Sequence, residues 1–253
     1  MWDKYPDAAG ALIVSPSPYG RAPTSRASRT SATNAESRSS STRRGARICF
    51  HDDLPTWAMD AGADVCVVSV HKMGAGFEQG SVYHVQGDLV DASHLSDCAD
   101  LLMTTSPNVL IYSAIDGWRR QMVEHGTELL GSALDLARTT RERIERIDGI
   151  SVLDDRLLGD EASHDLDRLQ VLMDLDELGV SGYQCADWLR ENCRLDVGMS
   201  DHRRILATMS MSDDEDTADR LVSALEALSR AAESFDPRPG SSCRVRTNCS
   251  SNR

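Results

Sequence analysis

The sequence predicts an α/β fold with a smaller C-terminal domain. Short apolar runs that are typical of buried strands alternate with helical segments along the chain, which is the pattern of α/β proteins. The chain has 253 residues, of which 40% are hydrophobic and 26% charged, so it can bury a sizeable core. Its longest apolar runs, such as 65–68, are far too short to cross a bilayer, and we expect no membrane helix.

The N-terminal half carries three expected strands and one long helix. Strands are predicted over 11–14, 63–69 and 80–85, because apolar residues run continuously or alternate there. A Ser-Pro break then precedes a helical stretch over 109–137, which a charged segment continues.

The C-terminal half is expected to contain strands over 169–175 and 205–209 and helices over 182–192 and 214–235. The tail from Asp236 is rich in Pro, Ser, Arg and Asn, so we expect it to be frayed.

Charge and cysteine content exclude several classes of protein. The formal net charge of -13 argues against a general binder of phosphate backbones, which needs a cationic face. The seven cysteines form no C-x-x-C pair and no Cys/His cluster at zinc spacing, so we expect reduced thiols and no metal site. The first residues show no basic stretch followed by an apolar one, and a cytoplasmic location is expected by default.

Residues 21–49 depart from this globular composition. They contain seven Ser and seven Arg, no Leu, Val, Phe, Tyr or Trp, and Glu36 as their one acid. Such a stretch cannot bury enough apolar surface to offset the entropy of ordering it, so we expect disorder or an irregular path. A regular buried strand over 38–42 would contradict this expectation. A nucleic-acid site is the less favoured alternative, because no aromatic residue interleaves with the arginines.

The motif Ser69-Val70-His71-Lys72 ends the second expected strand, and two glycines follow it closely. The ordinary interpretation is a strand-end lysine in solvent. The chemical interpretation is that a lysine held among apolar residues is partly desolvated, loses its proton and forms a Schiff base with an aldehyde. Ser69 would then donate to a phosphate, and His71 would lie against a heteroaromatic ring.

Further segments accompany this motif in a specific order: 53–64, 79–85, 102–108 and 176–183. Together they resemble the major domain and C-terminal region of the Orn/Lys/Arg decarboxylases, which are pyridoxal-phosphate enzymes of the aspartate-aminotransferase fold. The resemblance covers roughly residues 1–20 and 50–235.

The resemblance implies an incomplete aspartate-aminotransferase-like (fold type I) large domain with a smaller α+β C-terminal domain. It implies pyridoxal 5'-phosphate as the cofactor, Lys72 as the Schiff-base lysine, His71 as its active-site neighbour and Ser69 as a phosphate contact. Thr105 and Ser106 would reach the phosphate of a partner subunit, because the intact enzymes are dimers with shared sites. The implied divisions are a large-domain remnant over 1–20, an out-of-family segment over 21–49, the rest of the large domain over 50–125, a small domain over 126–235 and a disordered tail over 236–253.

Two features depart from the family pattern. In the family, the acid that keeps the pyridine nitrogen protonated comes from a D-E-A-x-G-A-H segment, and residues 41–47 of this chain hold no acid. Met1 also falls at the middle of the family's large domain, so most of the phosphate cradle and the ring-stacking residue would be missing. We therefore expect an incomplete fold and a chain that is inactive alone.

A displaced reading frame explains the first departure. In this frame, each new codon consists of the third base of one residue's codon and the first two bases of the next residue's codon. With suitable synonymous codons for residues 21–49, it translates as CADLARIADVCHERGIPLIVDEAWGAHL. This peptide contains an amphipathic helix, a turn, the apolar strand PLIV and the motif DEAWGAH, in the family's order. We interpret it as two compensating frame changes near Gly20 and Cys49, in the gene or in its sequencing. An acquired Ser/Arg linker is the alternative.

Three functions remain open at this point. The leading hypothesis is a truncated, frame-shifted relative of a decarboxylase (a carboxy-lyase) acting on a basic amino acid, a substrate class implied by the resemblance alone. An aminotransferase or another lyase of the same fold is the second, because a Schiff-base lysine serves several chemistries. A non-enzymatic remnant, or a protein that binds through its Ser/Arg segment, is the third.

Overall fold

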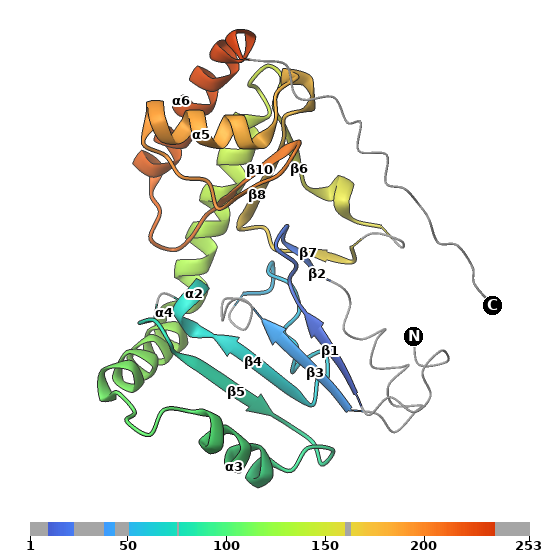
Figure 1. Cartoon of the computed structure of the whole chain (residues 1–253), viewed down its shortest axis with the longest axis vertical. Helices are drawn as coiled ribbons and strands as arrows, with labels where there is room; N and C mark the ends of the chain where they lie inside the picture. The colour runs from blue at the N-terminus through green and yellow to red at the C-terminus, as the bar shows by residue number, and fades with distance from the viewer. Residues whose placement is uncertain (1–9, 23–37, 44–50, 75, 160–162, 236–253) are drawn as a thin grey trace, which may run out of the picture.

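The computed structural model describes residues 10–22, 38–43, 51–74, 76–159 and 163–235. Two four-stranded sheets in this part of the chain lie at opposite ends of the molecule (Figure 1). The long helix α4 (Val109–Ile144) runs from one sheet to the other.

The first sheet has the strand order β1-β3-β4-β5. Its strands are β1 (Gly10–Val14), β3 (Arg38–Arg43), β4 (Val65–Ser69) and β5 (Ser81–Val85). β1, β3 and β4 run parallel, whereas β5 pairs antiparallel with β4. The short helix α2 (Val70–Met73) follows β4 directly, at the carboxyl end of the parallel strands.

β4 is a buried strand, as its apolar sequence predicts. Val65, Cys66 and Val68 are all buried and belong to a small core under the sheet. β1 differs, because Leu12 and Val14 are 71% and 55% exposed although they are apolar. Parallel sheets are normally covered on both faces, so β1 marks the part of this sheet that the described residues leave open.

β3 corrects one expectation from the sequence. Residues 21–49 were expected to be disordered or irregular, yet β3 is a regular strand between β1 and β4, and β2 (Arg21–Ala22) is a second short strand. The two flanking strands present backbone donors and acceptors to β3, and these ladder hydrogen bonds do not depend on the side chains. The rest of that segment lies outside the described residues.

Two helices follow β5. The side chains of Asp91 and Asn108 cap α3 (Ala92–Leu102) and α4, each by accepting from a backbone N–H of the first turn. The sequence patterns do not predict α3, because it buries none of its residues and has no clear core-facing stripe. α4 buries no residue before Met122, and its later turns enter the C-terminal core.

The second sheet has the order β6-β8-β10-β9, and all its pairs are antiparallel. Its strands are β6 (Ser151–Leu153), β8 (Gln170–Asp174), β9 (Met199–Ser200) and β10 (Arg204–Thr208). The helices α5 (Gly182–Cys193) and α6 (Glu215–Ala231) pack with the second half of α4 into the main core, around Leu130, Ile205 and Leu225. Short 3-10 turns complete this end of the molecule: Asp155–Leu157, Asp176–Leu178 and Ala232–Ser234.

The residues after β1 connect the two ends. β2 pairs antiparallel with β7 (Asp165–Leu166), and the Tyr19 hydroxyl donates to Asp201 Oδ2 at 2.9 Å. On α4, the buried Arg141 guanidinium donates to the backbone oxygens of Arg168 and Gln170. Burial lowers the pKa of Arg141 to about 10, and these carbonyls hold the charge.

The structure confirms the α/β alternation. β1, β4, β5, β8, β10, α4, α5 and α6 lie where the sequence patterns predict them, with small shifts at their ends. α4 passes unbroken through residues 125 and 126, so the expected border between the two domains falls inside one helix. The expected tail over 236–253 lies outside the described residues. No helix in the described part of the chain is long and apolar enough to cross a membrane.

Candidate functional site

The turn from β4 into α2 presents the Ser-Val-His-Lys motif at the carboxyl end of the parallel strands (Figure 1). Val70 is fully buried in the small core, so it anchors the turn from below. Ser69 ends β4, is the N-cap of α2 and is 9% exposed. Its side chain makes no capping hydrogen bond, and no other described residue pairs with its hydroxyl, which is therefore available to a ligand.

His71 is held by Gly80, the residue directly before β5. Its Nδ1 lies 2.8 Å from the Gly80 carbonyl oxygen, and its backbone N–H donates to the same oxygen at 3.3 Å. Because a carbonyl oxygen only accepts, the Nδ1–H of His71 is the donor in this contact, and no described hydrogen bond engages Nε2. A Cβ at Gly80 would lie 3.2 Å from Ile115 Cδ1, so glycine allows this close approach. Sequence reasoning missed Gly80, whose signal is a glycine directly before the alternating strand.

The glycines after the motif have a steric reason. A Cβ at Gly74 would lie 2.7 Å from the Val70 carbonyl oxygen, closer than real side chains come. The N–H of Gly76 donates to that same oxygen at 3.2 Å. The chain therefore folds back tightly over α2, which fixes the backbone that carries Lys72.

Lys72 itself is exposed, and no described residue forms a hydrogen bond or an ion pair with its amine. Because Lys72 is exposed, the expected partial desolvation is wrong for the described residues. The ordinary interpretation, a strand-end lysine in solvent, describes its surroundings correctly. An unpaired, accessible amine is nevertheless what a condensation with an aldehyde requires.

Thr105 and Ser106 lie in the exposed loop between α3 and α4. The backbone N–H of Ser106 donates to the Thr104 hydroxyl at 3.2 Å. None of the described hydrogen bonds or ion pairs joins this loop to Ser69 or Lys72.

His84, the histidine of β5, is half-buried and packs against an aromatic side chain. Its ring meets Trp57 edge-on, with ring centroids 5.0 Å apart and an interplanar angle of 88°. Burial lowers the pKa of His84, so the neutral ring is favoured. It is therefore a packing residue, distinct from His71.

The acid that a pyridine nitrogen needs is not supplied by β3. In the sheet register Thr42 lies opposite Val67 of β4, close to the strand ends that carry the motif, and residues 37–50 contain neither Asp nor Glu. The amine of Lys72 and the hydroxyl of Ser69 fit pyridoxal phosphate, but the position beside its ring nitrogen is not filled from this strand. The fit is incomplete.

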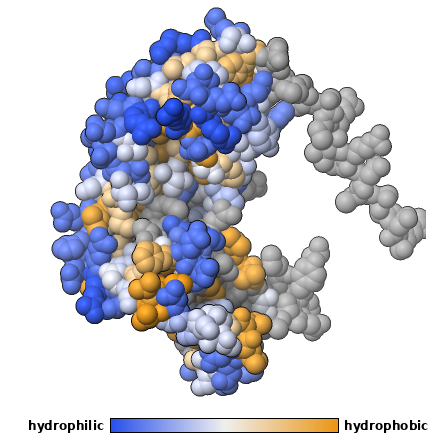
Figure 2. Space-filling view, turned by 60° about the vertical axis from the view of Figure 1, so that its left-hand side comes forward, coloured by the Kyte–Doolittle hydropathy of each residue, from blue (hydrophilic) through white to orange (hydrophobic). Residues whose placement is uncertain are grey.

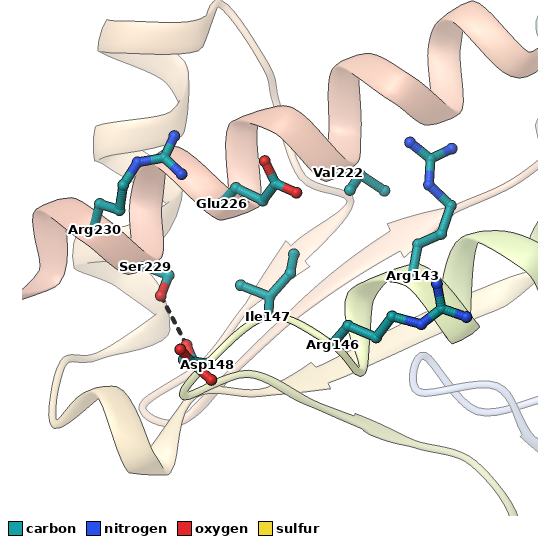
Figure 3. A pocket seen from close by; sticks show the side chains of 8 residues that line it. All are labelled: Arg143, Arg146, Ile147, Asp148, Val222, Glu226, Ser229 and Arg230. Carbon is teal, nitrogen blue, oxygen red and sulfur yellow. Dashed lines mark hydrogen bonds between the residues drawn. The ribbon is translucent and has the colours of Figure 1, made fainter.

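Two cavities lie elsewhere. One of about 390 Å³ lies between the end of α4 and α6, and Figure 3 shows Arg143 and Arg230 at its opposite ends. Ser229 donates to the Asp148 carbonyl oxygen across it at 2.8 Å, and Arg143 pairs with Asp219 at 2.7 Å. Another, of about 590 Å³, opens between residues 52–56 and α4. Neither is lined by the motif residues, so neither is the site implied by the resemblance.

Comparison with solved structures identifies the fold. The constitutive lysine decarboxylase of E. coli matches with a TM-score of 0.71 at 18% identity, over 88% of this chain and 37% of that one. Lysine decarboxylase A from Pseudomonas aeruginosa matches with a TM-score of 0.74 at 19% identity, over 89% and 37%. An alanine–glyoxylate aminotransferase from Nostoc sp. has a TM-score of 0.69 at 14% identity, over 90% and 63%. The chain therefore has the architecture of fold type I enzymes, as expected.

Comparison with protein sequences identifies the relatives. Arginine decarboxylase of Halalkalibacterium halodurans is 34% identical over 232 residues, 89% of this chain and 46% of the relative. Arginine decarboxylase of Bacillus subtilis is 32% identical over 234 residues, 92% and 48%. The chain thus spans about half the length of these relatives. Residues 45–166 match the family model of the Orn/Lys/Arg decarboxylase major domain. Over residues 45–166, therefore, the chain matches the major domain of the Orn/Lys/Arg decarboxylase family.

Proposed function

We propose that this chain is part of a pyridoxal-phosphate-dependent decarboxylase of basic amino acids, that it binds the cofactor through Lys72, and that it is inactive alone. The observation that carries the proposal is the motif turn, which sets an amine and a hydroxyl that no described residue pairs at the carboxyl end of the parallel strands. The substrate class rests on the relatives, which are arginine and lysine decarboxylases by name.

Each motif residue has a defined task in this proposal. Lys72 would hold the cofactor, because an accessible lysine amine is the group that condenses with an aldehyde and releases water. Ser69 would donate its hydroxyl hydrogen to the phosphate. His71, whose Nδ1 contacts the Gly80 carbonyl oxygen, would lie beside the pyridine ring. When bound, pyridoxal phosphate supplies the sink for the electrons that remain after carbon dioxide departs.

Turnover is expected to be negligible. The electron sink works only if the ring nitrogen stays protonated, and β3 supplies no acid for it. Positioning and electrostatic preorganisation provide most of the rate in such sites, so a site without the acid should lose several orders of magnitude. Binding and turnover are therefore separable here.

A homodimer is part of the same proposal. The end of α3 and the start of α4 expose a run of apolar side chains: Leu101, Leu102, Met103, Val109, Leu110 and Tyr112. Figure 2 shows apolar surface on the lower half of the molecule, the half that contains the first sheet and α3 in Figure 1. Apolar surface of this kind usually marks a contact with another protein. Thr105 and Ser106 lie between these residues, where a second copy would place them near its own motif turn.

The test uses the small number of lysines. The chain contains two, Lys4 and Lys72, so Lys4→Ala is a matched control for Lys72→Ala. Titration with pyridoxal phosphate, followed by the absorbance of the bound cofactor, should show at least tenfold weaker binding for Lys72→Ala and unchanged binding for Lys4→Ala. Equal binding by the two variants would contradict the proposal.

Products separate the chemical alternatives. With carboxyl-labelled arginine, lysine or ornithine and pyridoxal phosphate, this chain should release label no faster than the Lys72→Ala variant. Rapid, Lys72-dependent release would mean that the chain is a working decarboxylase and that its missing acid is unimportant. Formation of an oxo acid instead of carbon dioxide and amine would favour an aminotransferase.

A further inference from the structure

β3 is chemically out of place in its sheet. It lies between β1, which reads Gly-Ala-Leu-Ile-Val, and β4, which reads Val-Cys-Val-Val-Ser, and it runs parallel to both. Strands inside parallel sheets are usually near-continuous runs of Val, Ile and Leu. β3 reads Arg-Ser-Ser-Ser-Thr-Arg. The backbone topology and the side-chain composition of this strand therefore disagree.

The displaced frame removes the disagreement at the same residues. With the codon choices given above, Pro, Leu, Ile and Val of that frame would be encoded by bases that overlap the codons of residues 37–41. The structure places β3 at Arg38–Arg43. The apolar run that precedes the acidic motif in the displaced frame thus falls on the residues that form β3. The position of β3 is independent of the codon choices.

The connection between β1 and β3 gives a second agreement. Parallel neighbours need a crossover of a dozen or more residues, which is usually a helix. β1 ends at Val14 and β3 begins at Arg38. In the displaced frame the intervening residues read CADLARIADVCHERGI, in which Leu, Ile and Val recur at helical spacing and a glycine follows where a helix would end. The printed residues 23–37 contain no Leu, Ile or Val.

The register also places an acid. With the same codon choices, the Asp of VDEAWGAH would be encoded across the codons of Ser41 and Thr42, and these residues pair with Cys66 and Val67 of β4. β4 continues from there through Ser69 into α2 and Lys72. Because parallel strands end at the same edge of a sheet, this acid would lie at the edge that carries the motif.

We infer that β3 is the displaced-frame copy of an apolar, acid-tipped strand, and that the acid missing from the Lys72 site is encoded across codons 41 and 42. The position of β3 comes from the sheet, and its displaced-frame origin is argued from the codon choices. The role of the acid rests on the function proposed above.

The first test reads the gene across codons 20–50. The displaced frame requires one particular set of third bases, and the protein sequence does not determine them. Bases that translate in that frame as an apolar run followed by Asp-Glu are the expected result. A stop codon, or a polar run opposite β3, would overturn the inference without any protein being made.

The second test replaces residues 21–48 with the displaced-frame peptide, which has the same length. A matched control carries the same residues in shuffled order. Burial of the three aliphatic side chains should raise the midpoint of thermal unfolding by roughly 10 °C over both the original chain and the control. Equal midpoints for the three proteins would contradict the strand assignment.

The acid is tested separately in that restored chain. Changing its new Asp to Asn should leave the unfolding midpoint within about 2 °C, because the change is isosteric and lies at a strand end. It should weaken pyridoxal phosphate binding at least tenfold. Unchanged binding would refute the acid assignment. If the restored chain gains stability but Lys72→Ala does not affect binding, the proposed function fails while the strand assignment holds.

Discussion

Replacing Gly182 with alanine should destabilise the C-terminal end of the molecule strongly. Gly182 is the first residue of α5, directly after the capping box made by Ser181 and Gln184. An added Cβ would lie 2.5 Å from the Asp201 carbonyl oxygen and closer still to that of Arg204. Both obstacles are backbone atoms, so no side-chain rotation can relieve the clash.

The magnitude follows from what must move. The two carbonyls flank the turn into β10, and the backbone N–H groups of Arg203 and Arg204 donate to the Asp201 carboxylate there. Overpacking of a well-packed site lowers the free energy of unfolding by about 1–3 kcal/mol. We expect about 3 kcal/mol for Gly182→Ala, because the added Cβ meets backbone atoms on two sides. For a chain of this size that corresponds to a fall of roughly 6–12 °C in the unfolding midpoint.

Thermal unfolding followed by circular dichroism measures this fall. Gly117→Ala is the control, because Gly117 lies in the middle of α4 with nothing within 4 Å of an added Cβ. Alanine there should stabilise the helix by about 0.5–1 kcal/mol. A Gly182→Ala protein as stable as the original would refute the packing described for α5 and β10.

Three further predictions concern the turn, the domain connection and pH. Gly74→Ala should cost about 1–3 kcal/mol in unfolding free energy, because its Cβ would meet the Val70 carbonyl oxygen, and a loss below 0.5 kcal/mol would contradict the tight turn. Arg141→Met should cost about 3 kcal/mol by urea unfolding, since two backbone oxygens lose their buried donor, and an unchanged midpoint would argue against those bonds. Burial opposes the ionisation of Asp201, but hydrogen bonds from the Arg203 N–H and the Tyr19 hydroxyl lower its pKa overall. The ionised Asp201 should therefore contribute fully to the free energy of unfolding above about pH 4, and this contribution should be lost below that pH. The difference in unfolding free energy between the original chain and Asp201→Asn should accordingly be smaller at pH 3 than at pH 7. A constant difference would contradict this.

The parts of the fold that can be predicted from sequence are those whose side chains carry a period. β4 and α6 are such elements, because each buries a continuous or helical set of apolar residues. α3 buries nothing, and β3 is held by backbone pairing with its neighbours, so neither leaves a pattern in the printed residues. The sequence therefore fails to predict α3 and β3 because both elements depend on tertiary context.

The candidate site likewise has a part that can be predicted from the sequence and a part that cannot. Lys72 and Ser69 follow from a motif at a strand end. The carbonyl of Gly80 that holds His71 does not, because it depends on the antiparallel pairing of β4 with β5. The exposure of Lys72 depends on which segments cover the sheet, and local sequence does not encode that.

The measurement that tests the central claim most directly is the site of covalent capture. The full chain is incubated with pyridoxal phosphate, reduced with borohydride, digested and mapped by mass spectrometry. Modification should concentrate on the peptide containing Lys72, and Lys4, the one other lysine in the chain, should be modified at least tenfold less. Equal modification of both lysines would contradict the claim that the turn after β4 is a cofactor site.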